Sequence, residues 1–163
     1  PAGPARRLGR LADLRSPVRV ILVSPGRPGL DTGNQVTARR WAGLLRELGH
    51  RATIQPEYDG GAADVLVALH ARKSFPSVAR FRRDRPGRPV VVALTGTDLY
   101  GDLRKSAKAR RSLEIADRVV LLQPAGLDEL PPSPRAKARV VYQSAIRPRG
   151  RVPSRKEEFE VVV

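Results

Sequence analysis

The chain has 163 residues, a hydrophobic fraction of 40% and a net charge of +15, so it is long enough for one domain with a hydrophobic core. It has no cysteine and 2 histidines. This composition excludes disulfides, thiolate metal sites and a cysteine nucleophile, and it argues against a metal cluster built from histidine. No apolar run reaches the roughly 18 residues of a membrane span, and residues 1–17 lack the apolar region of a signal peptide. We expect a soluble, cytoplasmic protein without a metal or an organic cofactor.

The positive charge has two explanations. Clustered Lys and Arg bind polyanions by releasing counterions, whereas an excess of Arg together with much Ala, Gly, Pro and Val is typical of a GC-rich proteome. We favour the second explanation, with a basic surface that suits phosphorylated small molecules, and we expect no nucleic-acid ligand. Methionine is absent even at position 1, so we expect that the ends of this sequence are not the natural ends of the protein.

The first predicted unit is a strand, a loop and a helix. Residues 18–23 form an apolar run that ends at a Ser-Pro-Gly turn, as expected of a buried strand. From Gly33, apolar residues recur at three- and four-residue spacings until Gly49, which predicts a helix with a glycine cap. Gly33 and Asn34 open this helix, where free amides can receive a phosphate group; an ordinary helix cap is the alternative. The glycines lack the G-x-G-x-x-G spacing, so a dinucleotide is not indicated.

Strand and helix patterns then alternate along the chain. Strands are predicted at 51–55, 63–70, 88–94, 117–123 and 138–143, and helices at 74–83, 104–116 and 125–130. The strands are continuous runs rich in Val and Leu, which is typical of parallel strands that are covered by helices on both faces. We therefore predict a Rossmann-like, doubly wound parallel sheet over residues 17–145.

The two ends of the chain differ in composition from this domain. Residues 1–16 and 146–157 are rich in Arg, Pro and Gly, and we expect them to be a flexible basic N-terminus and a basic linker. Residues 158–163 include the apolar run FEVVV. We expect this run to be the first strand of a second domain, and the alternative is that it pairs at the edge of the first sheet.

Polar residues follow the predicted strands directly. In doubly wound sheets the ligand lies beyond the carboxyl ends of the strands, so these polar tips should converge at one edge. A histidine there can transfer a proton, and Arg and Lys can bind phosphate oxygens. The candidate catalytic residues are His70 and Asp98, and the candidates for binding the acceptor or a phosphate group are Gly33, Asn34, Arg72, Lys73, Ser74, Thr95, Gly96, Thr97, Gln123, Gln143 and Ser144.

Each candidate also has a structural alternative. His70 can be an ordinary buried histidine, and Asp98 can cap the helix that follows it. Arg72 and Lys73 can be solvated surface residues in a chain this basic. The amide groups of Gln123 and Gln143 can belong to solvated loops.

Several quoted segments point to one family. In chain order, ILVSPGRPGLDTGNQVTARRWAGLLRELGHRA, DVLVALHARKS, VVALTGTDLYGDL, SLEIADRVVLLQPAGLDEL and ARVVYQSA resemble the N-terminal half of the selenosugar synthases of selenoneine biosynthesis. These enzymes are GT-B glycosyltransferases related to the retaining family-4 enzymes. The resemblance covers about residues 17–145 and is most specific at TGTDLY and HARKS.

The resemblance implies two Rossmann-like domains that face each other across a cleft. The C-terminal domain would hold most of the UDP-sugar, either UDP-glucose or UDP-N-acetylglucosamine, and the N-terminal domain would hold the acceptor, selenophosphate. The sequence departs from the family because the C-terminal domain is missing, so we expect acceptor binding without turnover. The alternatives are a family-4-like transferase with another acceptor and a basic, non-catalytic module that binds nucleic acid or a protein partner.

Overall fold

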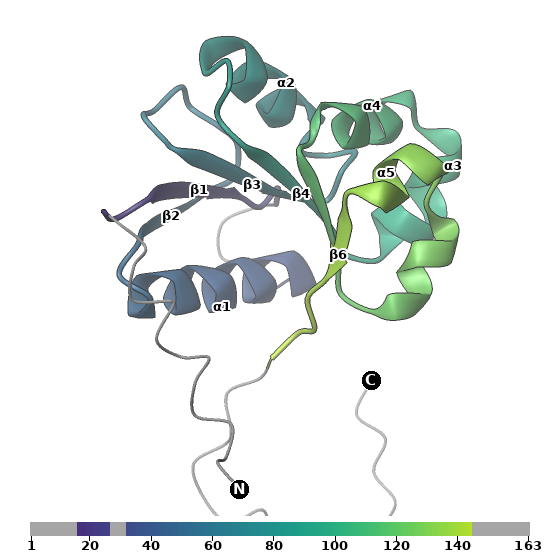
Figure 1. Cartoon of the computed structure of the whole chain (residues 1–163), viewed down its shortest axis with the longest axis horizontal. Helices are drawn as coiled ribbons and strands as arrows, with labels where there is room; N and C mark the ends of the chain where they lie inside the picture. The colour runs from purple at the N-terminus through teal and green to yellow at the C-terminus, as the bar shows by residue number, and fades with distance from the viewer. Residues whose placement is uncertain (1–15, 27–31, 145–163) are drawn as a thin grey trace, which may run out of the picture.

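A computed structural model describes residues 16–26 and 32–144, and the expectations for residues 1–15, 27–31 and 145–163 lie outside this part. It contains one six-stranded, all-parallel sheet with the order β2-β1-β3-β4-β5-β6 (Figure 1). The predicted Rossmann-like α/β fold is therefore confirmed. The strands are β1 (Arg19–Val23), β2 (Arg51–Gln55), β3 (Val65–Leu69), β4 (Val90–Leu94), β5 (Arg118–Leu121) and β6 (Ala138–Val140).

Helices cover both faces of the sheet. Helix α1 (Gly33–Glu47) lies on one face, and α2 (Phe75–Asp84) and α4 (Ala107–Ile115) lie on the other (Figure 1). The shorter elements are a π-helical turn η2 (Asp98–Asp102), α3 (Leu103–Lys105), a 3-10 helix η3 (Pro124–Glu129) and α5 (Pro132–Ala136). Among the described residues, no helix is both long and apolar enough to cross a membrane.

The ends of α1 follow the predicted signals. Thr32 precedes the helix, and its hydroxyl accepts a hydrogen bond from the Gln35 N–H at 3.4 Å. At the other end Gly49 has a φ of +85°, a conformation that glycine adopts readily, and its N–H donates to the carbonyl of Arg46. The helix therefore begins and ends where the sequence predicts.

Three elements differ from the sequence-based expectation. The helix expected over 104–116 is interrupted because Ser106 is extended and its hydroxyl accepts the Ala109 N–H, which starts α4 as a separate helix. Helix α5 was not predicted; Pro132 occupies its first position, where the missing N–H of proline is tolerated. The strand expected over 138–143 ends at Val140.

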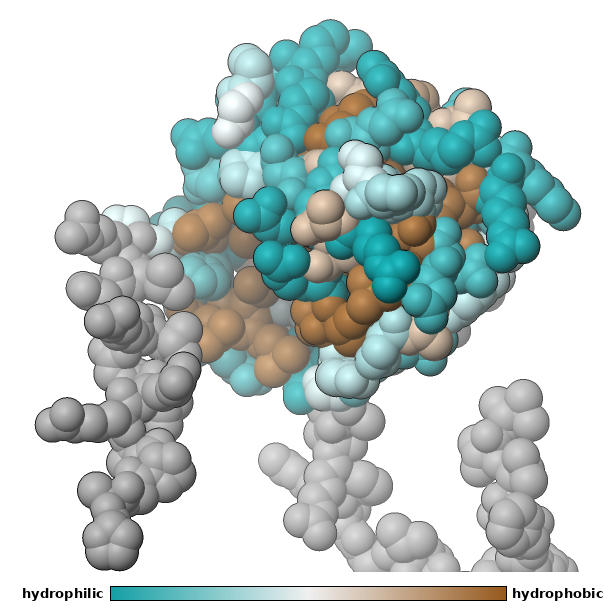
Figure 2. Space-filling view, turned by 45° about the vertical axis from the view of Figure 1, so that its right-hand side comes forward, coloured by the Kyte–Doolittle hydropathy of each residue, from teal (hydrophilic) through white to brown (hydrophobic). Residues whose placement is uncertain are grey.

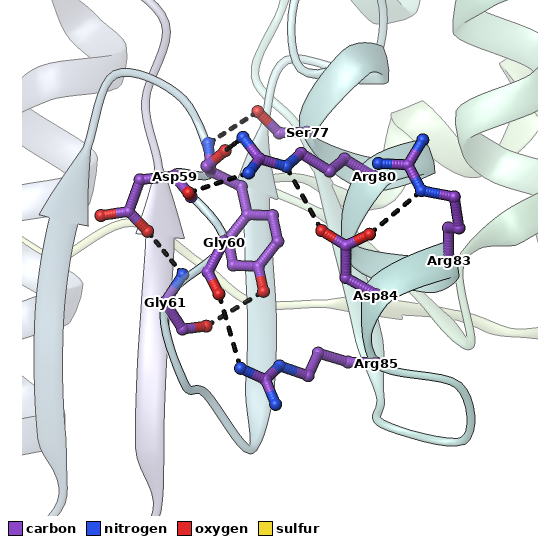
Figure 3. Close-up of polar contacts among 9 residues, drawn as sticks. Asp59, Gly60, Gly61, Ser77, Arg80, Arg83, Asp84 and Arg85 are labelled. Carbon is purple, nitrogen blue, oxygen red and sulfur yellow. Dashed lines mark hydrogen bonds and ion pairs between the residues drawn. The ribbon is translucent and has the colours of Figure 1, made fainter.

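A loop, residues 56–64, joins β2 to β3 without a helix. Tyr58 of this loop is buried against Phe81 of α2, with the two ring centroids 5.1 Å apart in an edge-to-face arrangement. Arg80 of α2 donates hydrogen bonds to the carbonyls of Tyr58 and Asp59, and Ser77 accepts the Tyr58 N–H (Figure 3). Side chains of α2 thus hold the loop in the place where a crossover helix would otherwise pack.

The two faces of the sheet have separate hydrophobic clusters. The cluster under α2 and α4 includes Leu66, Phe81 and Val92, all fully buried. The cluster under α1 is smaller, and beside it an apolar groove of about 290 Å³ lies open between α1 and the sheet. Figure 2 shows brown, apolar surface gathered on this lower side of the molecule. The groove is lined by Trp41, Leu44, Leu45, Leu48, Val67, Val91, Val120, Val141, Tyr142 and Ser144.

Candidate functional site

The strand order creates a topological switch point at β1 and β3. The chain passes from β1 through α1 to β2 on one side, and from β3 through α2 to β4 on the other. Connections that leave in opposite directions open a crevice at the carboxyl ends of the strands. Val23 pairs with Ala68 near those ends, so the loops that begin at Ser24 and at His70 border the same crevice.

Asp98 connects two of the loops at this edge. It is fully buried, and its two carboxylate oxygens accept hydrogen bonds from the backbone N–H groups of Ala71 and Thr95, each at 2.9 Å. The Ala71 bond spans 27 positions of the chain. Asp98 therefore holds the loop after β3 against the loop after β4. The catalytic role expected for Asp98 stays a prediction, while its position and contacts are those of a positioning residue.

His70 lies in the loop after β3 in a left-handed backbone conformation, with a φ of +71°. Such a conformation costs of order 1 kcal/mol outside glycine and persists only where the surroundings enforce it. Here the His70 N–H donates to Ala93, its carbonyl accepts the Ser74 N–H, and the Ser74 hydroxyl donates to the carbonyl of Leu69 at 2.6 Å. Ser74 is thus buried and bonded to the backbone, so it supports the loop.

The imidazole of His70 is buried and held in one orientation. Its Nδ1 accepts the Lys73 N–H at 3.4 Å, which leaves the proton on Nε2, and Nε2 lies 3.8 Å from a carboxylate oxygen of Asp102. Burial lowers the pKa of His70, the positive charges of Lys73 and Arg72 act in the same direction, and the Asp98 and Asp102 carboxylates oppose them. The side chain is therefore a neutral hydrogen-bond donor near neutral pH.

Two cations stand beside this histidine. The guanidinium of Arg72 donates to Asp102 at 2.7 Å and remains about half exposed, while Lys73 is exposed. The arrangement of His70, Asp102 and Arg72 joins the loop after β3 to the η2 turn. Asp102 was not predicted from the sequence, although its place at the end of the quoted TGTDLYGD segment, four residues after Asp98, was a usable signal.

The start of α1 borders the same crevice. Ser24 is completely buried at the end of β1, and its hydroxyl has no hydrogen-bond partner among the described residues. The side-chain amide of Gln35, in the first turn of α1, donates to the Ser24 carbonyl at 3.3 Å, so this turn lies next to the end of β1. Gly33 is exposed and Asn34 is partly exposed at the helix N-terminus, where backbone amides carry partial positive charge.

A pocket of about 290 Å³ lies at the carboxyl ends of β4 and β5. It brings together four of the predicted residues, Thr95, Gly96, Gln123 and Gln143. Tyr100 also lines it and was missed, although it belongs to the quoted TGTDLY motif. The remaining lining residues are Leu94, Leu99 and Leu122.

Other predicted residues lie on this edge without entering the pocket lining. Thr97 is exposed and begins the η2 turn, and the hydroxyl of Ser144 accepts a hydrogen bond from Arg40 of α1 at 3.1 Å. The Gln143 side chain donates to Thr37 of α1 at 2.7 Å. The segment after β6 is therefore hydrogen-bonded to α1. These bonds place the pocket residue Gln143 against this helix.

The chain was compared with models of known protein families and with curated proteins, and neither comparison gives a match. Within the described residues there is also no group of three His, Asp or Glu side chains that could hold a metal ion. The case for a function therefore depends on the geometry of this edge and on the motifs quoted from the sequence.

Proposed function

We propose that this domain is the acceptor-binding half of a glycosyltransferase that joins selenophosphate to the sugar of a UDP-sugar and so forms a selenosugar. The observation that carries the proposal is the switch point of the sheet, where His70, Arg72 and Lys73 stand on the loop after β3, and the neighbouring strand β1 leads to the N-terminus of α1. Cationic side chains and helix N-terminal amides are the groups that bind phosphate oxygens. The resemblance of HARKS and TGTDLY to the selenosugar synthases supplies the reaction.

In the proposed reaction, the selenium of selenophosphate attacks the anomeric carbon of the sugar. The carbon–selenium bond forms as the bond to UDP breaks, and UDP leaves with the electron pair. Water then cleaves the selenium–phosphorus bond, which releases phosphate and the selenosugar. Because selenophosphate is already a strong nucleophile, the protein's task is to position it and to stabilise the charge of the departing UDP.

The residues of the edge would divide this task. Lys73 is exposed and can add a point charge to a bound phosphate group, whereas His70 is buried with Nε2 facing Asp102 and would position the loop that carries Lys73. Asp98 would act through the backbone, since it holds Ala71 next to His70. Transfer itself requires a nucleotide-sugar domain, so the test of activity uses the protein expressed from its complete reading frame.

The test is incubation of that protein with UDP-glucose or UDP-N-acetylglucosamine and selenophosphate, followed by mass spectrometry for a selenium-bearing sugar. Lys73→Gln should raise KM for selenophosphate about tenfold, because a hydrogen bond to a charged group is lost. Arg51→Gln, at the opposite edge of the sheet, is the matched control and should leave KM unchanged. If neither donor gives a selenosugar, the proposal is wrong.

The distribution of charge favours one alternative, a basic module that binds nucleic acid. Basic side chains also lie at the amino edge of the sheet, where Arg51 and Arg118 are exposed and Asp64 forms ion pairs with Arg19 and Arg88. A DNA-binding module would show affinity for duplex DNA that falls steeply with salt. In that case Arg51→Gln, and not Lys73→Gln, would weaken DNA binding.

A further inference from the structure

The pocket at the ends of β4 and β5 differs in chemistry from the crevice beside it. Its lining consists of leucines, one tyrosine, two glutamines, a threonine and a glycine, and none of these described residues is charged. At about 290 Å³ it lies at the lower end of the range for small-molecule sites. It therefore suits one small ring rather than a whole nucleotide.

The polar groups of the pocket are arranged to recognise hydroxyl groups. The Gln123 side-chain amide donates to the Tyr100 hydroxyl oxygen at 2.5 Å, which leaves the Tyr100 O–H free to donate to a ligand. The Gln143 amide nitrogen donates to Thr37 at 2.7 Å, so each of the two glutamine nitrogens uses one of its two N–H groups within the protein. Their carbonyl oxygens are acceptors that the O–H groups of a sugar can satisfy.

The loop that forms one wall also disfavours an anion. The Thr95 N–H, which could otherwise bind an anion, donates to the buried Asp98 carboxylate at 2.9 Å. The same loop turns at Gly96, whose φ is +129° and whose carbonyl accepts the N–H groups of Leu99 and Tyr100. The Thr95 N–H is therefore already bonded within the protein and is not available to bind an anion in the pocket.

We propose that this pocket binds the uncharged, hydroxyl-bearing sugar ring of the glycosyl donor, while phosphate groups bind at the switch-point crevice. This proposal rests on the proposed function. It assigns the sugar ring and the phosphate groups of the substrates to two neighbouring subsites. The three leucines provide apolar surface for the C–H faces of the ring, and Tyr100, Gln123 and Gln143 provide the hydrogen-bonding groups.

The test is NMR of the ¹⁵N-labelled chain, titrated separately with methyl α-D-glucopyranoside and with inorganic phosphate. The sugar should shift the signals of the Thr95–Tyr100 loop and the side-chain amide of Gln123. Gln123→Leu and Tyr100→Phe should each weaken the sugar response at least tenfold. Tyr142→Phe removes a hydroxyl from an exposed tyrosine outside the pocket and should change the response less than twofold.

The outcomes separate this inference from the proposed function. If phosphate shifts the same loop and competes with the sugar, or if the sugar causes no shift there, the pocket does not bind a sugar. If the sugar binds as expected but phosphate does not shift Gly33, Asn34 or Lys73, the proposed anion site is wrong and the sugar pocket stands. All three substituted residues are exposed, so the spectra of the variants should remain those of the folded chain.

Discussion

The two faces of the sheet differ in how fully helices and loops cover them. Under α2 and α4, a continuous cluster extends from Tyr58 in the β2–β3 loop to Ala138 in β6. Under α1, the cluster is confined largely to β1, β2 and β3, and Val91 and Val120 remain partly exposed along the groove. The difference arises because the connections from β3 to β4 and from β4 to β5 carry α2 and α4 on the covered face, so α1 is the one helix that the described residues place on the other face (Figure 1).

A continuous apolar strand does not by itself reveal whether both of its faces are covered by helices. Strands β4 and β5 have the apolar pattern of strands buried on both faces, yet one face of each borders the groove. The covered face should therefore carry most of the free energy of unfolding. The open face should be tolerant of substitution. Substitutions on the two faces test this difference.

The largest effect is expected for Phe81→Ala on the covered face. Phe81 is fully buried and packs edge-to-face on Tyr58, so its removal should lower the free energy of unfolding by about 3–5 kcal/mol. Trp41→Ala on the open face should cost about 1–2 kcal/mol, because Trp41 is only partly buried. Urea denaturation measures both values. Equal losses would mean that the groove is covered in solution.

Gly126→Ala tests how tightly the covered face is packed. A Cβ at Gly126 would lie 2.9 Å from a Leu99 methyl group and 3.1 Å from a Leu121 methyl group, so overpacking should cost about 1–3 kcal/mol. Gly101→Ala, where a Cβ meets no atom within 4 Å, is the control and should change stability by less than about 0.5 kcal/mol. Urea denaturation measures both values. If Gly126→Ala leaves the free energy of unfolding unchanged, η3 packs loosely on the sheet.

A smaller effect should appear with pH at His70. Burial lowers its pKa in the folded protein, so below the unfolded pKa of about 6.5 the unfolded chain binds the proton more readily. The free energy of unfolding should thus be unaffected by His70 above about pH 7 and should fall as the pH drops toward 5. Asp64, whose pKa the Arg19 hydrogen bond lowers to about 2, stays charged over this range.

His70→Asn isolates that dependence. Asparagine tolerates the left-handed backbone and keeps an acceptor for the Lys73 N–H, so the variant should fold. We subtract the free energy of unfolding of this variant from that of the unsubstituted chain. The result should be lower at pH 5 than at pH 7.5, because only the chain with His70 loses stability as this histidine is protonated. A difference that is the same at both pH values would show that His70 is not held neutral by burial.

The smallest effect is expected for Tyr142→Ser on the open face. Tyr142 is 69% exposed, so the free energy of unfolding should change by less than about 0.5 kcal/mol. The fluorescence of a dye that binds apolar surface should decrease, because Tyr142 lines the groove. A large loss of stability would contradict the description of this face as open.

The strands could be predicted from local patterns, and so could the edge of the sheet where the candidate residues lie. The strand over 51–55 and the start of α1 at Gly33 were placed correctly because a short apolar run and a helix cap are local signals. The polar tips were placed on one edge because parallel strands end at the same side. The interruption at Ser106 was missed, since a Ser within an apolar periodicity is compatible with either a helix interior or a cap.

An all-parallel α/β sheet and the edge where its polar loops meet follow from the sequence, because strand length, apolar continuity and turn residues are properties of short segments. Three features depend on how the folded chain is arranged in space: Asp98 bonds to Ala71 and Thr95, Arg80 holds the β2–β3 loop, and Tyr100 and Gln123 share a pocket. Such contacts join residues up to 27 positions apart. Their partners are selected by how the strands are ordered in space, which no short segment specifies.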